Sequence, residues 1–306
     1  MELLKTLCNI HAPAGEEYRL TEFLLDYIAL NKETWKVQPT IIVGEGFQDN
    51  IILVFGKPKT AVFAHIDSIG FTVKYNKELI KIGGPRTETG WKLKGFEMNG
   101  NAVETELIVK ASEESTYYEH SGDVIERGTA LTFNCDFRLT DDFVQSCYLD
   151  NRLGVWTALQ LCETMENGAI VFSTWEEHGG GSVSYLAKYL ADNYQINQGL
   201  IADITWVTEG VKHGEGVAVS MRDSLLPRRT FVNRIIDIAK KHNIKHQLEV
   251  ESAGGSDGKE LQAAAHPWDW CFIGAPEDHV HTPNEKVHLG DIESMVALYK
   301  VLLKEL

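Results

Sequence analysis

The segment 169–182 constrains the fold more than any other, because a short apolar run in it ends abruptly in polar and flexible residues. The residues Ile170–Thr174 are mostly β-branched or aromatic, which predicts a buried strand. Two carboxylates follow, Glu176 and Glu177, and then a histidine and three glycines. In an open α/β sheet, ligands bind beyond the carboxyl ends of the strands. A lone pair of glutamates in a turn is usually only solvated, so the other strand ends decide the interpretation.

Strands and helices alternate along most of the chain. Apolar runs typical of strands lie at 40–43, 50–55, 60–64, 198–203, 247–250 and 270–274, and helical periodicity lies at 1–12, 16–30, 153–165, 182–193, 230–242 and 291–304. This alternation predicts an α/β fold, a three-layer sandwich with helices on both faces of a mostly parallel central sheet.

The pattern changes between 71 and 142. Short alternating runs at 71–75, 79–82, 102–109 and 130–134 are separated by turn residues, and no helix of three turns is predicted. Such short strands are typical of a small β barrel or sandwich. We therefore expect one α/β domain, 1–70 and 143–306, that is interrupted by an inserted β domain, 71–142.

The composition limits the partners and the compartment. The formal net charge of −15 argues against a nucleic-acid partner and is compatible with a cation site or with a substrate that carries a positive amino group. No basic leader and no run of about 20 apolar residues is present, so neither a signal peptide nor a membrane span is expected. The cysteines are odd in number and widely spread, which predicts reduced core residues and a cytoplasmic protein: Cys8, Cys135, Cys147, Cys162 and Cys271.

Matching polar groups occur at several predicted strand ends or shortly after them: His65, Asp67, Asp150, Glu176, Glu177, Asp203 and His281. Taken singly, each has an ordinary explanation; Asp150, for example, could cap the following helix. Two imidazoles with several carboxylates and no thiolate together suit a divalent metal such as Zn²⁺, Co²⁺ or Mn²⁺. Five ligands with one carboxylate shared can hold two ions. A remaining carboxylate could then act as general base and acid.

Other functions stay open on the residues alone. The run Gly254–Gly258 matches the Gly-x-Ser-x-Gly pattern of serine hydrolases, but three residues separate it from the predicted strand, and a serine triad leaves His65 without a role. Glu176 and Glu177 could be the pair of a glycoside hydrolase, although neighbours on an extended chain point to opposite sides. A non-catalytic binding or assembly protein on the same scaffold is a further alternative.

The motifs occur in the order of a known family. They are the segments 64–71, 149–154, 176–177 with the glycines that follow, 202–205, 254–257 and 281–285. With these motifs the chain resembles, over essentially its whole length, the glutamyl-aminopeptidase-like or tetrahedral aminopeptidase family of dinuclear metallo-aminopeptidases. Some members of this family have been labelled endoglucanases.

The resemblance implies a zinc-exopeptidase-like fold and a metal-dependent aminopeptidase that removes N-terminal residues from peptides. It implies two divalent metal ions per subunit, Zn²⁺ ahead of Co²⁺ or Mn²⁺. His65 and Asp203 would bind one ion, Glu177 and His281 the other, and Asp150 would bridge the two.

The same resemblance gives roles to the remaining motif residues. Glu176 would be the general base that activates the attacking water and later protonates the leaving amine. Asp67 would orient His65 through its other ring nitrogen. The substrate cleft would be lined by Gly254, Gly255, Ser256 and Asp257.

The inserted domain takes part in large assemblies in relatives, so a homo-oligomer is expected. The module 71–142 is shorter than expected for the family, which weakens the case for a dodecamer. His178 stands where relatives usually carry a small apolar residue. Asp278 and His279 stand where relatives more often carry basic or aromatic residues.

Overall fold

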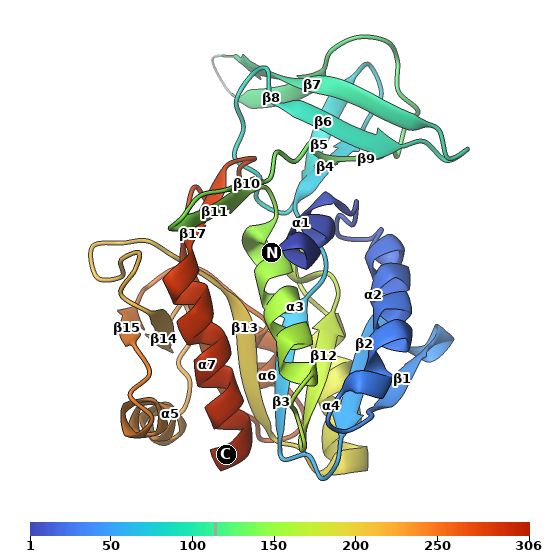
Figure 1. The fold of residues 1–306 in the computed structure, drawn as a ribbon. Coiled ribbons are helices and arrows are strands. Elements are labelled where there is room, and N and C mark those ends of the chain that lie inside the picture. The colour runs from blue at the N-terminus through green and yellow to red at the C-terminus, as the bar shows by residue number, and fades with distance from the viewer. Residues whose placement is uncertain (113–114) are drawn as a thin grey trace.

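A computed structural model describes residues 1–112 and 115–306 (Figure 1). The helices are α1 Glu2–Asn9, α2 Tyr18–Asn31, α3 Leu149–Cys162, α4 Ser182–Tyr194, α5 Arg229–Lys241, α6 Gly258–Ala263 and α7 Leu289–Glu305, with short 3₁₀ turns η1 Lys32–Thr34, η2 Glu45–Phe47 and η3 Glu176–His178. The strands of the large sheet are β1 Thr40–Gly44, β2 Gln48–Phe55, β3 Thr60–His65, β10 Arg138–Leu139, β11 Phe143–Ser146, β12 Gly168–Ser173, β13 Gln198–Trp206, β14 Val217–Arg222, β15 His246–Val250, β16 Asp269–Asp278 and β17 Glu285–His288.

The centre of the large sheet is parallel. Its main path runs β1-β2-β12-β3-β13-β16-β17-β11-β10, and β14 joins β16 and carries β15 at its other side. β12, β3, β13 and β16 pair in parallel with one another, whereas β1, β2 and β17 are antiparallel to their neighbours. The carboxyl ends of the four central strands therefore meet at one edge of the sheet.

Helices cover both faces of this sheet. α1, α2, α3, α5 and α7 pack on one face, and α4 and α6 pack on the other (Figure 1). The sequence of β3 shows why two cores form: Val62 and Ala64 enter the first core, whereas Ala61 and Phe63 enter the second. Successive side chains on a strand point to opposite faces, so an uninterrupted apolar strand feeds both layers. The predicted three-layer α/β sandwich is confirmed.

The inserted segment forms a closed barrel that stands at one end of the sandwich (Figure 1). Its strands are β4 Gly70–Val73, β5 Glu78–Ile82, β6 Lys92–Phe96, β7 Ala102–Ala111, β8 Thr116–His120 and β9 Ala130–Phe133, in the order β4-β5-β8-β7-β6-β9. A small core centred on Phe71, Leu93, Leu107 and Phe133 fills it. The predicted β barrel is confirmed, whereas the exact division at 71–142 stays a prediction, since β10 and β11 pair with the large sheet.

The prediction that all five cysteines are reduced is wrong for one pair. Cys135 and Cys147 form a disulfide across the β10–β11 hairpin, and Cys8, Cys162 and Cys271 are free and buried. The spacing of Cys135 and Cys147 in the sequence did not predict a disulfide. The two side chains meet only because the hairpin between them turns the chain back. None of the helices in the described part of the chain is long and apolar enough to cross a membrane.

Candidate active site and metal centre

The polar groups predicted at strand ends gather at the carboxyl edge of the central sheet. The topology explains this, because β3, β12, β13 and β16 are parallel and close together. β3 ends on His65, β12 precedes the turn η3 with Glu176 and Glu177, β13 carries Asp203, the loop after β16 carries His281, and α3 begins beside Asp150.

His65, Asp150 and Asp203 form the first group of possible ligands. Nε2 of His65 lies 3.3 Å from Oδ1 of Asp150 and 3.6 Å from Oδ2 of Asp203. One ligand atom from each residue falls within 4.8 Å of the others, and all three side chains are buried. This spacing would allow one cation to be bound by all three.

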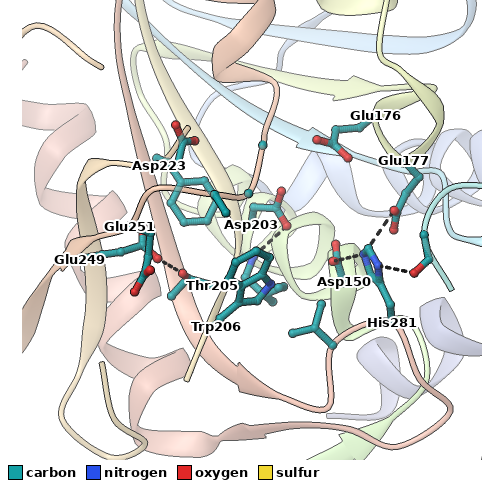
Figure 2. A pocket seen from close by; sticks show the side chains of 17 residues that line it. Asp150, Glu176, Glu177, Asp203, Thr205, Trp206, Asp223, Glu249, Glu251 and His281 are labelled. Atoms are coloured by element: carbon teal, nitrogen blue, oxygen red, sulfur yellow. Dashed lines mark hydrogen bonds and ion pairs between the residues drawn. The ribbon is translucent and has the colours of Figure 1, made fainter. Parts of the chain in front are cut away.

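Asp150, Glu177 and His281 form the second group. Nε2 of His281 lies 3.3 Å from Oδ2 of Asp150 and 3.4 Å from Oε2 of Glu177. The three ligand atoms again lie within 4.8 Å of one another (Figure 2). Asp150 thus turns one oxygen to each group, which is the arrangement that a bridging carboxylate requires.

Glu176 belongs to neither group but lies beside both. Its Oε2 is 4.0 Å from Nε2 of His65, and its side chain lines the same cavity. Burial raises the pKa of Glu176 to about 8; His65 acts against this shift, and nearby carboxylates such as Asp257 add to it. A glutamate with a pKa near neutrality can both accept and return a proton.

The donor set fits two divalent cations. Burial, and then the charge of Asp150, raises the pKa values of Glu177 and Asp203 well above their ordinary range. Oε1 of Glu177 is buried and has no hydrogen-bond partner among the described residues. So many buried carboxylates repel one another unless positive charge lies between them, and two cations would supply it.

Asp67 supports the turn that carries the two glutamates. Its carboxylate oxygens accept hydrogen bonds from the backbone N–H groups of Glu176 and Glu177, at 3.1 and 3.0 Å. Nδ1 of His65 lies 3.4 Å from Asp67 but forms no hydrogen bond with the described residues. The clear contacts of Asp67 are thus with the turn, and its predicted action on His65 stays a prediction.

Glu285 is a supporting residue whose role was not predicted from the sequence. This fully buried carboxylate accepts hydrogen bonds from the backbone N–H groups of Asp150 and His281, at 3.2 and 3.0 Å. It therefore fixes the backbone of two possible ligands that are far apart in the chain. Glu285 is part of the motif 281–285, which was recognised in the sequence. Its hydrogen-bond partners could be identified only from the structure.

Four residues at the site have a left-handed backbone although they are not glycine. Tyr148, Trp175, His279 and His281 have φ values of 63°, 63°, 61° and 65°, and each lies at or within two residues of a possible ligand. This conformation is costly for residues with a Cβ atom and tends to persist at functional sites. The left-handed conformation bends the chain sharply next to the side chains that point into the site.

The predicted substrate residues 254–257 divide into two pairs. Gly254 and Gly255 line the cavity beside the site, whereas Ser256 and Asp257 do not. Ser256 is 5 % exposed, and its Oγ accepts a hydrogen bond from the N–H of Gly258. Asp257 accepts a hydrogen bond from the Ser173 hydroxyl at 2.7 Å. A serine nucleophile at position 256 therefore gains no support from the geometry.

The two unexplained histidines lie at the rim. Nδ1 of His178 accepts a hydrogen bond from the N–H of Gly83, in the loop after β5, and the side chain is exposed rather than packed under its own loop. His279 is also exposed and has a φ of 61°. Neither histidine belongs to the two groups of possible ligands in the described part of the chain.

The cavity extends away from the possible ligands over a wall that the sequence did not predict. Its volume is about 290 Å³, and the additional wall includes Thr205, Trp206, Asp223, Glu249 and Glu251 (Figure 2). β14, which leads to Asp223, was not predicted from the sequence. Without it, the three acidic side chains could not be placed together.

Comparisons with known proteins agree with the fold. A family model described as M42 glutamyl aminopeptidase matches residues 106–298. A putative aminopeptidase of Acetivibrio thermocellus is 27% identical over 329 residues, which cover 97% of this chain and 96% of that protein.

Solved structures show the same architecture. An aminopeptidase of the archaeon Desulfurococcus kamchatkensis has a TM-score of 0.85 at 20% identity, and the match covers 100% of this chain and 94% of that one. The TET1 peptidase of Pyrococcus horikoshii, which can assemble into a tetrahedron or a large octahedral shell, has a TM-score of 0.79 at 22% identity. The match covers 100% of this chain and 99% of that one. The predicted zinc-exopeptidase-like fold is thereby confirmed.

Proposed function

Because the chain belongs to the M42 glutamyl aminopeptidase family, we propose that it is a metal-dependent aminopeptidase that hydrolyses N-terminal residues from peptides. The observation that supports this most is the pair of ligand groups that share Asp150, with Glu176 beside them. A peptide hydrolase needs a polarised carbonyl, an activated water and a proton carrier at one place. The cavity beside Asp150 has room for a substrate residue.

The two ions would be held by five side chains. His65 and Asp203 would bind one, Glu177 and His281 the other, and Asp150 both; imidazole and carboxylate donors favour Zn²⁺, with Co²⁺ or Mn²⁺ as alternatives. When bound, two such ions polarise a scissile carbonyl and lower the pKa of water. Glu285 and Asp67 would hold the backbone around these ligands in place.

Glu176 would move the proton. Its Oε2 would accept a proton from the attacking water and then donate it to the leaving amine, since burial raises the pKa of this carboxyl towards neutrality. The backbone N–H of Glu176 donates to Asp67, which fixes the main chain from which this side chain extends.

The decisive variant is Glu176→Gln, which removes the proton carrier and keeps the shape of the side chain. We expect near-normal metal content and melting temperature but a loss of turnover on aminoacyl-anilides of about a hundredfold or more. Near-normal turnover would exclude Glu176 as the general base. Release of free amino acids from a peptide mixture by the unmodified protein should stop with a chelator and return with Zn²⁺, Co²⁺ or Mn²⁺.

The same assays separate the alternatives. A serine hydrolase would ignore the chelator and lose activity in Ser256→Ala. A glycoside hydrolase would cleave β-glucan whether or not the chelator is present. A non-catalytic binding protein would release no amino acid from any peptide, even with metal restored.

We also propose that the chain forms a homo-oligomer in the cytoplasm. The ability of the P. horikoshii peptidase to form closed shells supports self-association. Loops of the barrel carry exposed apolar side chains, including Met98 at 89 % and Val124 at 80 %, which contact with a second copy would bury. Light scattering measures the assembly mass directly.

A further inference from the structure

The extended wall of the cavity is acidic. Asp223, Glu249 and Glu251 line the cavity together with the possible metal ligands. In Figure 2, these three carboxylates lie on one side of the view and Glu176, Glu177 and His281 on the other, with Asp203 and Trp206 between them. The acidic wall is therefore separate from the groups that would hold the metals, although it belongs to the same cavity.

Two neighbouring parallel strands create this wall. β14 and β15 pair in parallel, with Arg222 opposite Val250, so their carboxyl ends meet at the same edge. Asp223 directly follows β14, whereas Glu249 and Glu251 are two residues apart at the end of β15 and can face the same side. The charges of Asp223 and Glu251 both act on Glu249, which confirms that the three groups are close.

The wall is largely buried rather than solvated. Glu249 is 4 % exposed and Asp223 is 8 % exposed. Burial raises the pKa of Glu249 to about 7, and the neighbouring carboxylates add to the shift. Burial likewise raises the pKa of Asp223. Acidic residues of this kind are rarely buried without a compensating charge.

The described residues form no ion pair with the wall, although the charge of Arg222 acts against the rise in the pKa of Asp223. No Lys, Arg or His nitrogen lies within 4.0 Å of the three carboxylates across 1–112 and 115–306. Arg222 is near, but its Nε donates to the backbone carbonyls of Asp223 and Glu251, at 3.2 and 3.0 Å. Glu249 accepts from the Thr205 hydroxyl. Oδ1 of Asp223 accepts from the N–H of Leu225, whereas Oδ2 accepts no hydrogen bond from the described part of the chain.

A third metal ion does not explain the wall. Within the described ranges, three ligand atoms come within 4.8 Å of one another only in the two groups that share Asp150. The carboxylate oxygens of the acidic wall are therefore too far apart to hold one metal ion together. Their spacing fits a longer organic cation. Trp206, which is 40 % exposed and lies against Gly254, offers an aromatic face beside it. Aromatic faces attract both alkyl stems and cationic groups.

We propose that this cavity selects an N-terminal residue with a basic side chain, lysine or arginine, whose charged end binds at Asp223, Glu249 and Glu251. The inference rests on the proposed function, because it assigns the substrate residue next to the cleaved bond. The alkyl stem lies along Trp206, and the α-amino group and the carbonyl stay near Glu176 and the ligand groups.

The first experiment uses the unmodified protein with metal restored. It compares kcat/KM for the p-nitroanilides of lysine, arginine, norleucine and Nε-acetyl-lysine, which have similar stems but differ in charge. We expect lysine and arginine to exceed both neutral substrates by about tenfold or more. Equal or faster cleavage of norleucine would overturn the inference and leave the proposed function intact. Absence of cleavage for every substrate would overturn both.

The second experiment removes single charges. Glu249→Gln and Glu251→Gln should each lower the ratio of kcat/KM for lysine to that for norleucine by about tenfold. Glu251 is only partly buried, so its variant stays informative if Glu249→Gln does not fold. Glu209→Gln, an exposed carboxylate that does not line the cavity, is the matched control and should leave the ratio unchanged. An equal loss for lysine and norleucine would mean that the wall binds the α-amino group, which contradicts the inference.

Discussion

Asp150 is the residue on which both ligand groups depend. Its two oxygens face different histidines, His65 and His281, at 3.3 Å each. These hydrogen bonds to the histidines outweigh burial and hold the pKa of Asp150 below its usual range. The carboxylate is therefore ionised and directed to both sides at once, as a bridging ligand has to be. Asp203, in contrast, faces only the first group.

This difference predicts unequal metal loss in two variants. Asp150→Ala should lose both ions, because each group keeps only two ligands, whereas Asp203→Ala should mainly lose one ion. Elemental analysis of the purified variants, with the unmodified protein as reference, gives the metal-to-chain ratio. Two ions still bound in Asp150→Ala would contradict the bridging role. Equal loss in both variants would show that the two groups are not independent.

A residue's role could be predicted from the sequence where the chemistry of the site allows only a few residue types. The ligand candidates could be predicted, because few functions use two histidines and several acids at strand ends. Glu285 could not be given a role, because its partners are the backbone N–H groups of Asp150 and His281, and every residue except proline carries such a group. The disulfide between Cys135 and Cys147 was missed for a related reason, since only the hairpin brings the cysteines together.

At the scale of elements, the contact between α3 and β13 positions Asp150 against Asp203. Asn151 donates a hydrogen bond to the carbonyl of Ala202 at 2.8 Å and accepts one from the N–H of Gly154 at 2.8 Å. Gly154 is required because a Cβ atom there would lie 2.1 Å from the Ala202 oxygen and 2.2 Å from Oδ1 of Asn151. The helix can approach the strand so closely only without a side chain at this position.

Gly154→Ala should therefore destabilise the protein, by about 2 kcal/mol or more, because the helix has to move away from β13. Differential scanning calorimetry should show a melting temperature that is several degrees lower. Gly210→Ala is the matched control, since a Cβ atom there would meet nothing within 4 Å. If both variants melt like the unmodified protein, the close approach of α3 to β13 is not needed for stability.

The strands β14 and β15 carry the acidic wall, which leads to a prediction about how the substrate preference depends on pH. Below a pH of about 7, Glu249 is protonated and attracts a cation less; above it, the carboxylate is ionised. The charges of Asp223 and Glu251 add to the rise in the pKa of Glu249 that burial causes. Arg222 and the buried thiol of Cys271 are the other titratable groups nearby. The preference for lysine over norleucine anilides should therefore rise as the pH increases through 7.

The measurement is the ratio of the two kcat/KM values from pH 5.5 to 8.5. The ratio cancels changes at Glu176, which affect both substrates alike. In Glu249→Gln the rise should be weaker. A ratio that stays flat across this range in the unmodified protein would contradict the role of Glu249.

The central elements could be predicted because β3, β12, β13 and β16 are apolar runs buried between two helical layers. β14 and β17 were not predicted. β14 ends in polar and charged residues, and β17 has only four residues, so neither gives a clear periodic signal. As a result, the ligand groups could be inferred from the sequence, whereas the acidic wall could not.

At the scale of the whole molecule, the proposed self-association would involve loops of the barrel. Met98 and Val124 lie on adjoining loops: Glu126 accepts a hydrogen bond from the N–H of Met98, and its own N–H donates to Glu97. The two apolar side chains are almost fully exposed. Contact with a second copy would bury them, which gives a favourable free energy of association.

The net charge of −15 opposes this association, because every subunit adds the same charge. Salt screens such repulsion, so the assembly mass measured by light scattering should rise from 20 to 300 mM NaCl. The double variant Met98→Glu and Val124→Glu should shift the mass towards that of the 34.3 kDa chain at every salt concentration. Leu30→Glu, at a residue on α2 that is 81 % exposed, is the control and should assemble normally. A mass that falls with added salt would show that ion pairs, rather than these apolar loops, hold the subunits together.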